Sequence, residues 1–403
     1  MVKYFLFALC LISPSIIFSQ TPDWDTYKIM TYNLLGYPNS FTFIDYRYND
    51  LAAIVEYAAP DIVSINELRD DGDDRYADTL LYRSFNANGG PIFQRADIIT
   101  PSGDLNNMLF YNTEKFTLIN HNQVPCVLRD FDHFELMLND TNLPCHHDTI
   151  FLDIITTHLK AGTNAGDPEL RLEMAGTIMD YISTINPTHN VQMLGDFNLY
   201  DETDLAYQVI ITPTVNHTMI DSEGPWTRSD VTDVSRFTQS TRTTSNPGTN
   251  GGASSGLDDR FDFVLHNSIM EDNSQNISFV EGSYTCLGND GLHYDKALID
   301  APTNAAVPQS IAQDLFDMSD HYPVLKSYLV TWPTAPQNLA ITGENTGCTD
   351  NQYTYSVPAE TGCVYDWNVI GGTIINGQGS PQVIVTWDAN VTNEITCNRT
   401  CTQ

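Results

Sequence analysis

Hydrophobic and polar residues alternate along several short stretches of the chain, which is the pattern of half-buried β-strands. The first stretch is "YKIMTYNLL" at residues 27–35. Residues 48–59 instead repeat their apolar side chains at helical spacing. Further strands are predicted at residues 62–68, 107–111, 134–138, 150–158, 191–196, 260–266, 277–281 and 322–330. Because strands outnumber helices, the pattern predicts stacked β-sheets with helices on the outside.

A second helix is predicted between two of these strands. Asp167-Pro168-Glu169 supplies an N-cap, a proline at the first helical position and an acid in the first turn. The apolar spacing that follows carries this helix to about residue 183.

Two changes in composition divide the chain. Residues 240–256, "STRTTSNPGTNGGASSG", are low in complexity and predict a mobile loop. Residues 332–336, "WPTAP", have the composition of a linker. Beyond them, "YTYSV", "VYDWNVIGG" and "QVIVTW" are short strand candidates separated by turn residues, which predicts a small all-β sandwich. We therefore expect a large domain at residues 20–331 and a module at residues 332–403.

The N-terminus has the pattern of a signal peptide. A lysine at position 3 precedes an apolar run at residues 4–18, and Ser19-Gln20 follows it. The run is short for a transmembrane helix and contains Pro14, so a membrane anchor is the weaker interpretation. No other segment of the sequence is long and apolar enough to cross a bilayer, so we expect no stable membrane insertion. Residues 1–19 are interpreted as a signal peptide, and the protein is expected to be secreted or to lie at the cell surface.

Net charge limits the partners of the chain. Its 51 acidic and 18 basic residues give a formal net charge of -33. A chain this acidic repels polyanions, which argues against tight nucleic-acid binding through a basic surface. An anionic substrate would therefore need metal ions. Adaptation of an exported protein to salty surroundings explains the charge equally well.

The cysteines fit an exported protein with some disulfides. Of the eight cysteines, Cys10 lies in the predicted signal peptide, and the odd number that remains leaves at least one free thiol. We expect Cys126 to pair with Cys145, and pairing among the last four cysteines, whose connectivity the sequence leaves open. None of them has the paired short spacing of a zinc site.

Polar side chains lie at the ends of several of the predicted strands. The stretches are "TYNLL", "PDIVSINEL", "THLKAG", "LGDFN", "RFDFVL" and "SDHYPV", and their polar members are Asn33, Glu67, His158, Asp196, Asn198, Asp262, Asp320 and His321. Each has an ordinary explanation alone, such as a turn-capping asparagine or a core histidine. Together, so many polar groups at the ends of apolar strands are unfavourable unless they pair or bind a cation. Their joint occurrence predicts a single site.

These stretches, in this order, resemble the endonuclease/exonuclease/phosphatase family over roughly residues 27–330. One departure is Asn66, where the family more often has glutamine. The resemblance implies an α+β fold, a four-layer α/β/β/α sandwich with its site at one edge of the two sheets. The strand candidates of the C-terminal module resemble a polycystic-kidney-disease-like (PKD-like) domain.

The resemblance also implies a metal site. Glu67 would be the main metal carboxylate, with Asn33 and Asp320 near the ion. The chemistry of these residues agrees independently, because carboxylate and amide oxygens without thiolates suit a hard ion such as Mg2+, Mn2+ or Ca2+.

The remaining residues receive roles in phosphoryl chemistry from the same resemblance. Asp196 would deprotonate or align the attacking water, and Asn198 would orient that water or the phosphate. His158 and His321 would contact the phosphoryl oxygens, with Asp262 holding the ring of His321. A histidine kept cationic by an acid can stabilise such oxygens or protonate a leaving group.

Three further residues are candidates for substrate contacts. Arg129 in "CVLRDF" is expected either to face the phosphate or to lie on the surface. Tyr111 occupies a position where the family often has a strand tyrosine, although core packing also explains it. Lys160 follows His158 by two residues and would share its strand face if the strand continued.

The leading hypothesis is a secreted, metal-dependent phosphodiesterase that degrades DNA or RNA. An alternative within the enzyme class is a sphingomyelinase-like or phosphoinositide-type phosphoesterase. An alternative of another class is a non-catalytic binding protein of the cell surface. The C-terminal module is interpreted as a spacer, or as a unit that contacts the cell surface or polysaccharide, and we expect a monomer.

Overall fold

The computed structural model describes most of the chain in two units. The described residues are 26–39, 44–70, 72, 74–99, 105–139, 149–228, 230–244, 251–332, 339–344, 351–359, 363–389 and 393–401. The predicted signal peptide at residues 1–19 lies outside them. Within the described part of the chain, no helix has the length and apolar character needed to cross a membrane.

The first sheet of the large domain contains both ends of that domain's sequence. Its path is β11-β13-β1-β2-β4-β3, and β12 pairs with β13. The strands are β1 (Thr26–Tyr37), β2 (Ile62–Leu68), β3 (Phe93–Arg95), β4 (Asn106–Asn112), β11 (Ile277–Phe279), β12 (Thr285–Cys286) and β13 (Val324–Val330). β1 is parallel to β2 and antiparallel to β13. The last strand of the domain therefore lies beside the first.

The second sheet has the order β5-β6-β7-β8-β10-β9. Its strands are β5 (Phe116–Val124), β6 (Phe131–Leu138), β7 (Phe151–His158), β8 (Asn190–Asp196), β9 (Met219–Ile220) and β10 (Asp262–Asn267). β7 and β8 are parallel, and β10 is antiparallel to β8. Every residue of β8 is buried, as expected for a central strand covered on both faces.

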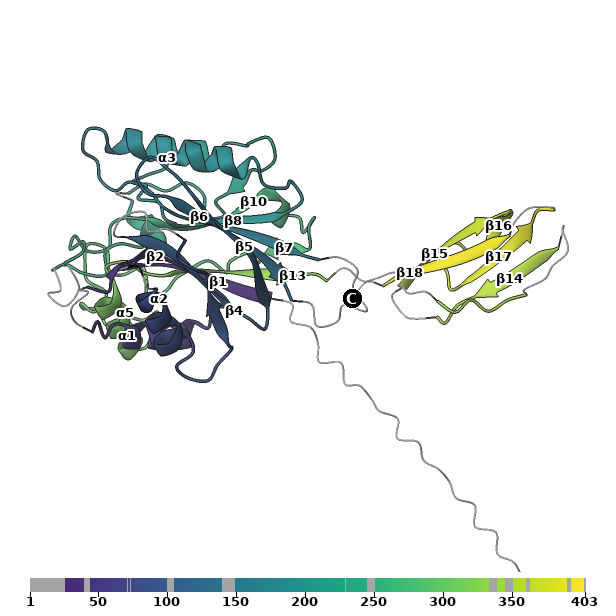
Figure 1. Ribbon diagram of the computed structural model, residues 1–403, viewed down its shortest axis with the longest axis horizontal. Coiled ribbons are helices and arrows are strands. Elements are labelled where there is room, and N and C mark those ends of the chain that lie inside the picture. Colours follow the sequence, from purple (N-terminus) through teal and green to yellow (C-terminus); the bar gives the residue numbers. More distant parts are fainter. Residues whose placement is uncertain are drawn as a thin grey trace, which may run out of the picture.

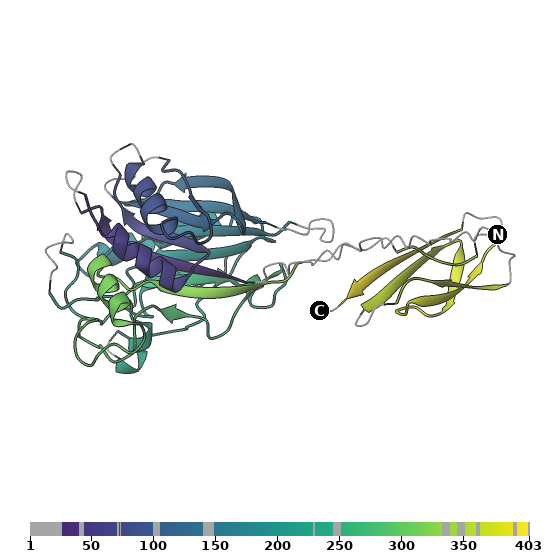
Figure 2. The ribbon, with the colours of Figure 1, turned by 90° about the horizontal axis from the view of Figure 1, so that it is seen from below.

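Helices form the two outer layers (Figures 1 and 2). The first sheet is covered by α1 (Tyr48–Ala58), α2 (Arg75–Leu80), the π-turn η1 (Leu81–Phe85) and α5 (Gln309–Met318), and the second by α3 (Asp167–Ile182) and α4 (Leu205–Ile210). Short 3-10 turns, η2 (Val231–Arg236) and η3 (Ser268–Met270), lie in the connections. The predicted four-layer α/β/β/α sandwich is confirmed.

The predicted helices form for the reasons that the sequence gives. α1 buries Leu51, Ile54, Val55 and Ala58, the apolar residues at helical spacing. α3 has its proline in the first turn, but Gly166 rather than Asp167 is the N-cap residue. The Asp167 carboxylate instead accepts a hydrogen bond from Asn164 N at 3.0 Å and pairs with Lys160.

The low-complexity segment is anchored at both of its described arms. Ser240 Oγ donates to Ala253 O at 2.8 Å, and Thr241 Oγ1 donates to Ser319 O at 2.6 Å. Arg242 is buried, and its guanidinium donates to Phe316 O. The prediction of a mobile loop is therefore wrong for residues 240–244 and 251–256, since tertiary hydrogen bonds hold a segment that its composition alone would leave free.

The C-terminal module is an all-β unit with its own core. Its strands are β14 (Gln352–Ser356), β15 (Cys363–Ile370), β16 (Gly372–Asn376), β17 (Gln382–Trp387) and β18 (Glu394–Cys401). β14-β17-β16 form one sheet and β15-β18 the other. Buried side chains from both sheets, including Tyr365, Trp367 and Val385, form its core. The small β-sandwich is confirmed, and its boundary after residue 331 stays a prediction.

The cysteines differ from expectation. Cys126 has a free thiol, as do Cys286 and Cys397, so the predicted pair of Cys126 with Cys145 is wrong. Cys145 itself lies outside the described residues. Cys363 is disulfide-bonded. Spacing in the sequence could not decide these pairs, because disulfide formation depends on distances between strands that are set by the fold.

A lysine is buried between the two sheets. Lys326 on β13 donates to Val264 O on β10 at 3.0 Å, and its ammonium lies 4.5 Å from the ring centroid of Phe279. Burial lowers the pKa of Lys326 to about 8, although Asp221 and Glu223 act in the opposite direction. Because the folded protein disfavours the charged form, this lysine destabilises the fold increasingly as the pH falls from 10.5, the ordinary lysine pKa, and in full below pH 8.

We expect Lys326→Met to raise the free energy of unfolding at pH 7 by about 1–3 kcal/mol, because it removes a buried cation. Above pH 8 the stability advantage of the variant should shrink, because the wild type becomes more stable as its folded form releases the proton of Lys326 before the unfolded chain does. Urea unfolding of the variant and the wild type between pH 7 and pH 10 measures the difference. The exposed Lys296 provides the control, Lys296→Met. A Lys326→Met protein less stable than the wild type at pH 7 would contradict the expectation.

Candidate active site

The predicted polar residues meet where the two sheets end on the same side. In the second sheet, Asp196 pairs in register with His158 on β7 and with Asp262 on β10. These three side chains therefore lie in one row across neighbouring strands. In the first sheet, Asn33 pairs with Asn66, and Glu67 is the next residue on β2. The polar residues of the first sheet and those of the second sheet therefore lie along the same edge of the sandwich.

Asn33 connects the two sheets at this edge. Its Nδ2 donates to Glu67 Oε1 at 3.1 Å and to Asp196 Oδ2 at 3.0 Å. Its Oδ1 accepts a hydrogen bond from Leu35 N at 2.9 Å. The side chain thus serves the two carboxylates as a donor, and its place near a metal ion stays a prediction.

His158, Glu67 and Asp196 form a compact group. His158 Nε2 lies 3.8 Å from Glu67 Oε1 and 3.5 Å from Asp196 Oδ2. One ligand atom from each of the three residues lies within 4.8 Å of the others, which is close enough for a shared metal ion. The family resemblance implies a phosphate contact for His158, and the geometry also makes it a candidate metal ligand.

The expected contact between Asp262 and His321 is present. His321 Nδ1 lies 2.7 Å from Asp262 Oδ2, and both residues are buried. Burial opposes the imidazolium, but Asp262 and Asp196 outweigh it and hold the pKa of His321 well above its usual value. His321 Nε2 lies 3.7 Å from Asp196 Oδ2, so the ring connects two carboxylates.

Two asparagines hold the strand ends around Asp196. Asn66 Oδ1 accepts from Asp196 N at 3.0 Å, and Asn66 Nδ2 donates to Thr157 O at 3.1 Å. Asn198 N donates to Asp196 Oδ1 at 3.0 Å, and Asn198 Nδ2 donates to Leu159 O at 3.2 Å. Asn66 is a departure from the family pattern, yet its carboxamide still joins β2, β7 and β8. The orientation of Asp196 depends on these neutral groups.

Electrostatics at the site favours an additional cation. The pKa of Asp196 is raised to about 7, chiefly by burial and also by the charges of Asp262 and Glu67, although His321 acts in the opposite direction. Burial also raises the pKa of Glu67, with Asp320 contributing in the same direction. The pKa of His158 is lowered by burial, by Arg129 and by His321, which favours a neutral ring able to bind a metal.

Two carboxylate oxygens provide a test of whether a divalent metal fits. Asp262 Oδ1 and Asp320 Oδ1 are buried and have no hydrogen-bond partner among the described residues. A buried carboxylate oxygen without a donor is unfavourable unless a cation is near. Asp196 supplies a ligand atom both to the close group with Glu67 and His158 and to the close group with Asp262 and His321, and carboxylate oxygens are the donors that hard divalent ions prefer. The residues therefore fit such an ion.

Asp320 is placed differently from the other acids. Its Oδ2 accepts from Ala253 N at 2.6 Å and from Gln239 Nε2 at 3.4 Å. Ser319 Oγ donates to Asn33 O at 2.6 Å and accepts from His321 N at 3.1 Å. The loop that carries Asp320 and His321 is thus fastened to β1, and β13 begins only at Val324, later than predicted.

The three predicted substrate residues have different outcomes. Arg129 Nη1 donates to Leu159 O at 3.1 Å, and its charge influences both Glu67 and His158. Lys160 instead pairs with Asp167 at 2.8 Å, because the strand does not continue past His158. Tyr111 lies opposite Ile62, at the far end of β2 from Glu67. The structure brings only Arg129 to the site.

Two residues at the site were not predicted. Gln239 Nε2 lies 2.6 Å from His321 Nε2, and Asn107 Nδ2 donates to Asp132 Oδ2 at 2.9 Å while its Oδ1 accepts from Asn66. Gln239 directly precedes the low-complexity segment, where nothing in the local sequence indicates a contact. The pair Asn106-Asn107 at the start of a strand was a weak signal for Asn107.

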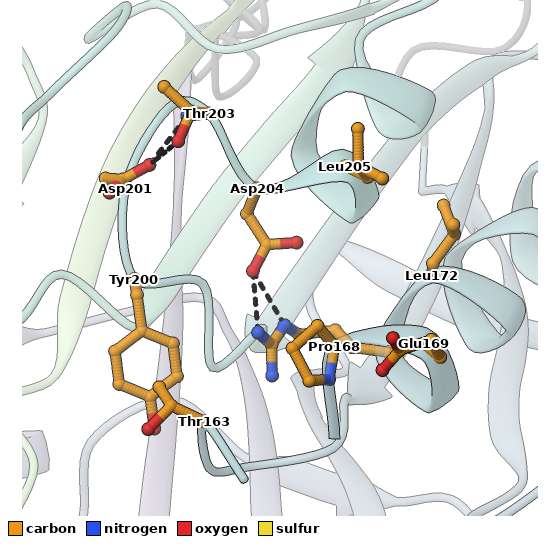
Figure 3. Close-up of a pocket in the computed structure, with 10 residues that line it drawn as sticks. Thr163, Pro168, Glu169, Leu172, Tyr200, Asp201, Thr203, Asp204 and Leu205 are labelled. Carbon is orange, nitrogen blue, oxygen red and sulfur yellow. Dashed lines mark hydrogen bonds and ion pairs between the residues drawn. The ribbon is translucent and has the colours of Figure 1, made fainter. Parts of the chain in front are cut away.

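A buried arginine holds the loops that follow β7 and β8. Arg171 Nη1 donates to Lys160 O at 2.8 Å and to Gly162 O at 3.1 Å, and Arg171 Nη2 donates to Asp204 Oδ2 at 2.7 Å. Tyr200 OH accepts from Gly162 N at 3.0 Å. Figure 3 shows Asp204 and Tyr200 on the wall of a pocket of about 330 Å³ beside these loops.

Arg171→Met should lower the free energy of unfolding by about 3 kcal/mol, because it leaves Asp204 buried without its cation. Urea denaturation followed by circular dichroism measures the change. Arg95→Met is a matched control, since Arg95 also forms ion pairs with aspartates (Asp74, Asp78 and Asp97) but in a more exposed setting, and it should change stability by less than about 1 kcal/mol. Equal effects of the two substitutions would argue against a special role for Arg171.

Comparisons with known proteins agree with this architecture. The family model described as "Endonuclease/Exonuclease/phosphatase family" matches residues 30–321, and a model described as "PKD-like domain" matches residues 333–403. A search of curated proteins finds no match.

Solved structures with a similar fold include three from different organisms. D. rerio TDP2, complexed with single strand DNA product, has 15% sequence identity and a TM-score of 0.48, covering 75% of this chain and 98% of that chain. The human Nocturnin catalytic domain with bound sulfate anion has 12% identity and a TM-score of 0.45, covering 76% and 94%. An endonuclease/exonuclease/phosphatase family protein from Bacteroides thetaiotaomicron has 14% identity and a TM-score of 0.45, covering 76% and 98%.

Proposed function

Because the chain belongs to the endonuclease/exonuclease/phosphatase family, whose members are metal-dependent phosphoesterases, we propose that it is an exported phosphodiesterase that hydrolyses DNA or RNA. The observation that carries the proposal is the group of Glu67, His158 and Asp196, whose ligand atoms lie within 4.8 Å of one another. The buried pair of Asp262 and His321 lies directly beside it. Export is proposed from the signal-peptide pattern of residues 1–19.

The side chains divide the chemistry among them. A bound divalent ion would neutralise the charge that develops on the phosphoryl oxygens. Asp196, whose pKa burial raises to about 7, can accept a proton from the attacking water near neutral pH. Asn198 holds the other oxygen of that carboxylate through its backbone N–H. His321, kept cationic by Asp262, offers its Nε2 proton to a phosphoryl or leaving-group oxygen.

The proposal of a nucleic-acid substrate rests on a site that suits a phosphate group, although the chain as a whole is strongly acidic. Arg129 is the basic side chain whose charge reaches Glu67 and His158, and it suits a phosphate in the same place. With a net charge of -33, the protein would bind a polyanion weakly and mainly through metal ions. Weak engagement suits an enzyme that releases its products quickly.

One observation favours a lipid phosphoester as the second candidate. Ile44 and Tyr46, which are 68% and 62% exposed, lie in the connection that follows β1, the strand that carries Asn33. Exposed apolar side chains near a phosphoesterase site could contact a membrane surface. If the protein were not catalytic, its several buried acids would have no explained role.

We further propose that the PKD-like module serves as a spacer or a surface-attachment unit on a monomeric, secreted or surface-bound protein.

Hydrolysis assays distinguish the candidates. Plasmid DNA, RNA, sphingomyelin and bis-p-nitrophenyl phosphate are each incubated with the protein in Mg2+, Mn2+, Ca2+ or EDTA. We expect cleavage of a nucleic acid with a divalent ion and none with EDTA, because the acids need a cation to hold phosphate. Cleavage of sphingomyelin alone would favour the lipid candidate, and no cleavage under any condition would reject the enzyme.

His321→Ala should lower kcat by roughly 100-fold or more, because it removes the proposed proton donor. The measurement is steady-state hydrolysis of bis-p-nitrophenyl phosphate, or of whichever substrate is cleaved. The Glu67→Gln variant should have lower activity than the wild type at limiting metal concentration, and its activity should recover in part at high metal concentration. Glu173→Gln, an exposed acid on α3, is the control and should match the wild type. Full activity of His321→Ala would refute the assignment of its role.

A further inference from the structure

The β12–α5 connection, residues 287–308, contains no helix or strand and yet packs against the loops at the site. Asp295 N donates to Leu257 O at 3.1 Å, and Leu298 N donates to Thr241 O at 2.9 Å. A connection of this length cannot rely on helical or sheet hydrogen bonds for its shape. Its own side-chain contacts therefore decide how it supports the residues that it touches.

The residues that this connection holds reach the acids of the site. They lie in two arms, residues 238–244 and 251–257. Thr241 N donates to Asp320 O at 3.0 Å, and Ala253 N donates to Asp320 Oδ2 at 2.6 Å. Each arm thus contacts Asp320 directly, and the β12–α5 connection holds both arms. A change in the shape of the connection is therefore transmitted to the loop that carries Asp320.

The ring of His293 lies inside the β12–α5 connection, 1% exposed, and each of its nitrogens faces oxygen acceptors. Nδ1 lies 2.8 Å from Asp290 Oδ1. Nε2 lies 2.9 Å from Pro302 O and 3.1 Å from Asp300 O. Carboxylate and carbonyl oxygens accept hydrogen bonds but donate none. Both ring nitrogens therefore carry a proton, which is the imidazolium form.

The partner carboxylate favours the same form. Asp290 also accepts from Leu292 N at 2.9 Å and from Ala305 N at 3.1 Å. Burial raises the pKa of Asp290, but the hydrogen bond from His293 and these two backbone donors outweigh it and hold that pKa below its ordinary value. Burial likewise opposes the imidazolium, but the hydrogen bonds to Asp290 and Asp300 O raise the pKa of His293. The two side chains form a charged pair.

The other charged side chains of this connection are directed to other partners. The Asp300 carboxylate accepts from Ala297 N at 2.9 Å, and Lys296 Nζ donates to Ala301 O at 3.2 Å. Within the described part of the chain, Asp290 is the only carboxylate that forms an ion pair with the His293 ring. The charge of the ring is thus balanced by a single acid.

We propose that the protonated ring of His293 is a pH-dependent latch, which holds the β12–α5 connection in the shape that supports the two arms. The ring joins residue 290, near the start of the connection, to residues 300 and 302 near its end. When the ring releases a proton to solvent, one nitrogen is left with a lone pair facing an oxygen, and that contact becomes repulsive. The latch needs neither a metal ion nor a substrate, so it holds whether or not the proposed hydrolysis is correct.

The direction of the pH dependence follows from the raised pKa of His293. Because the folded state favours the imidazolium, the contribution of the latch is complete below pH 6.5, the ordinary histidine pKa, and is lost as the pH rises through the raised pKa. Asp290 stays ionised over this range because its pKa lies below 3.8. The connection should therefore loosen in alkaline solution and not in mildly acidic solution.

The first test reads the protonation of the ring by 15N nuclear magnetic resonance on the full chain. More than half of His293 should be imidazolium at pH 6.5, where an ordinary histidine is half protonated. His217 is the internal control, because its Nδ1 lies 3.1 Å from the amide nitrogen of Asn267 and its Nε2 lies 3.3 Å from Ile185 O, which requires a neutral ring. A His293 ring that is mostly neutral at pH 6.5 would overturn the inference.

The second test measures hydrogen exchange by mass spectrometry at pH 6. In His293→Gln, the amides of residues 287–308 should exchange roughly tenfold faster or more, as expected from losing a hydrogen bond between charged groups. Peptides from the two arms should also exchange faster, because the connection holds them. His217→Gln is the matched control and should leave both regions as in the wild type. Unchanged exchange in a folded His293→Gln protein, checked by thermal melting, contradicts the latch.

The third test separates charge from packing. Hydrogen exchange of residues 287–308, corrected for the intrinsic effect of pH, should rise in the wild type as the pH increases from 6 to 9. Asp290→Asn should move this rise to lower pH, because it removes the charge that raises the pKa of His293. Asp295→Asn, which changes an exposed acid of the same connection, is the control and should leave the rise where it is.

A merely structural role for Asp290 predicts faster exchange by the same factor at every pH. That result, or wild-type exchange that does not change with pH after correction, would refute the latch. If His293→Gln fails to fold, the ring titration of the wild type and the Asp290→Asn comparison still decide the question.

Discussion

Repulsion among acids at the junction of two sheets is the constraint on which the rest of this structure depends. Glu67, Asp196, Asp262 and Asp320 come from different strands and loops, yet they converge on one edge, where burial raises the pKa of Asp196 to about 7. Such a cluster destabilises the fold unless its charge is balanced. The imidazolium of His321 supplies part of the balance, and a divalent cation would supply the remainder.

The groups around these acids are mostly neutral. Amide side chains of Asn33, Asn66, Asn198 and Gln239 contact the carboxylates or the backbone next to them, whereas Arg129 contacts a backbone carbonyl. Hydrogen bonds from amides fix direction without changing net charge. The arrangement therefore combines precise orientation with a strongly negative potential, which is the combination that a metal-binding phosphoesterase requires.

The sequence was informative where the position of a functional residue follows from the alternating pattern of a strand. Glu67, His158 and Asp196 lie at the ends of apolar strands and Asp262 at the start of one, so parallel and antiparallel pairing brings them together. The pattern also predicted stacked sheets with outer helices, and the family resemblance specified the four-layer sandwich. The sequence failed where contacts depend on tertiary structure. β5 was missed because much of this edge strand is exposed and does not alternate, Tyr111 lies at the wrong end of its strand, and Gln239 reaches the site only through the fold. Lys160 was misplaced because its strand ends at His158.

The position of β13 has a consequence for how the domain assembles. This strand is the last of the large domain in the sequence, yet it lies between β11 and β1, and the loop before it carries Ser319, Asp320 and His321. During synthesis, Asn33 and Glu67 leave the ribosome long before their partners exist. Contacts of such long sequence separation form late in folding. Asp320 and His321 therefore join the other residues of the site only when this last strand docks beside β1, so the site is complete only in the closed domain.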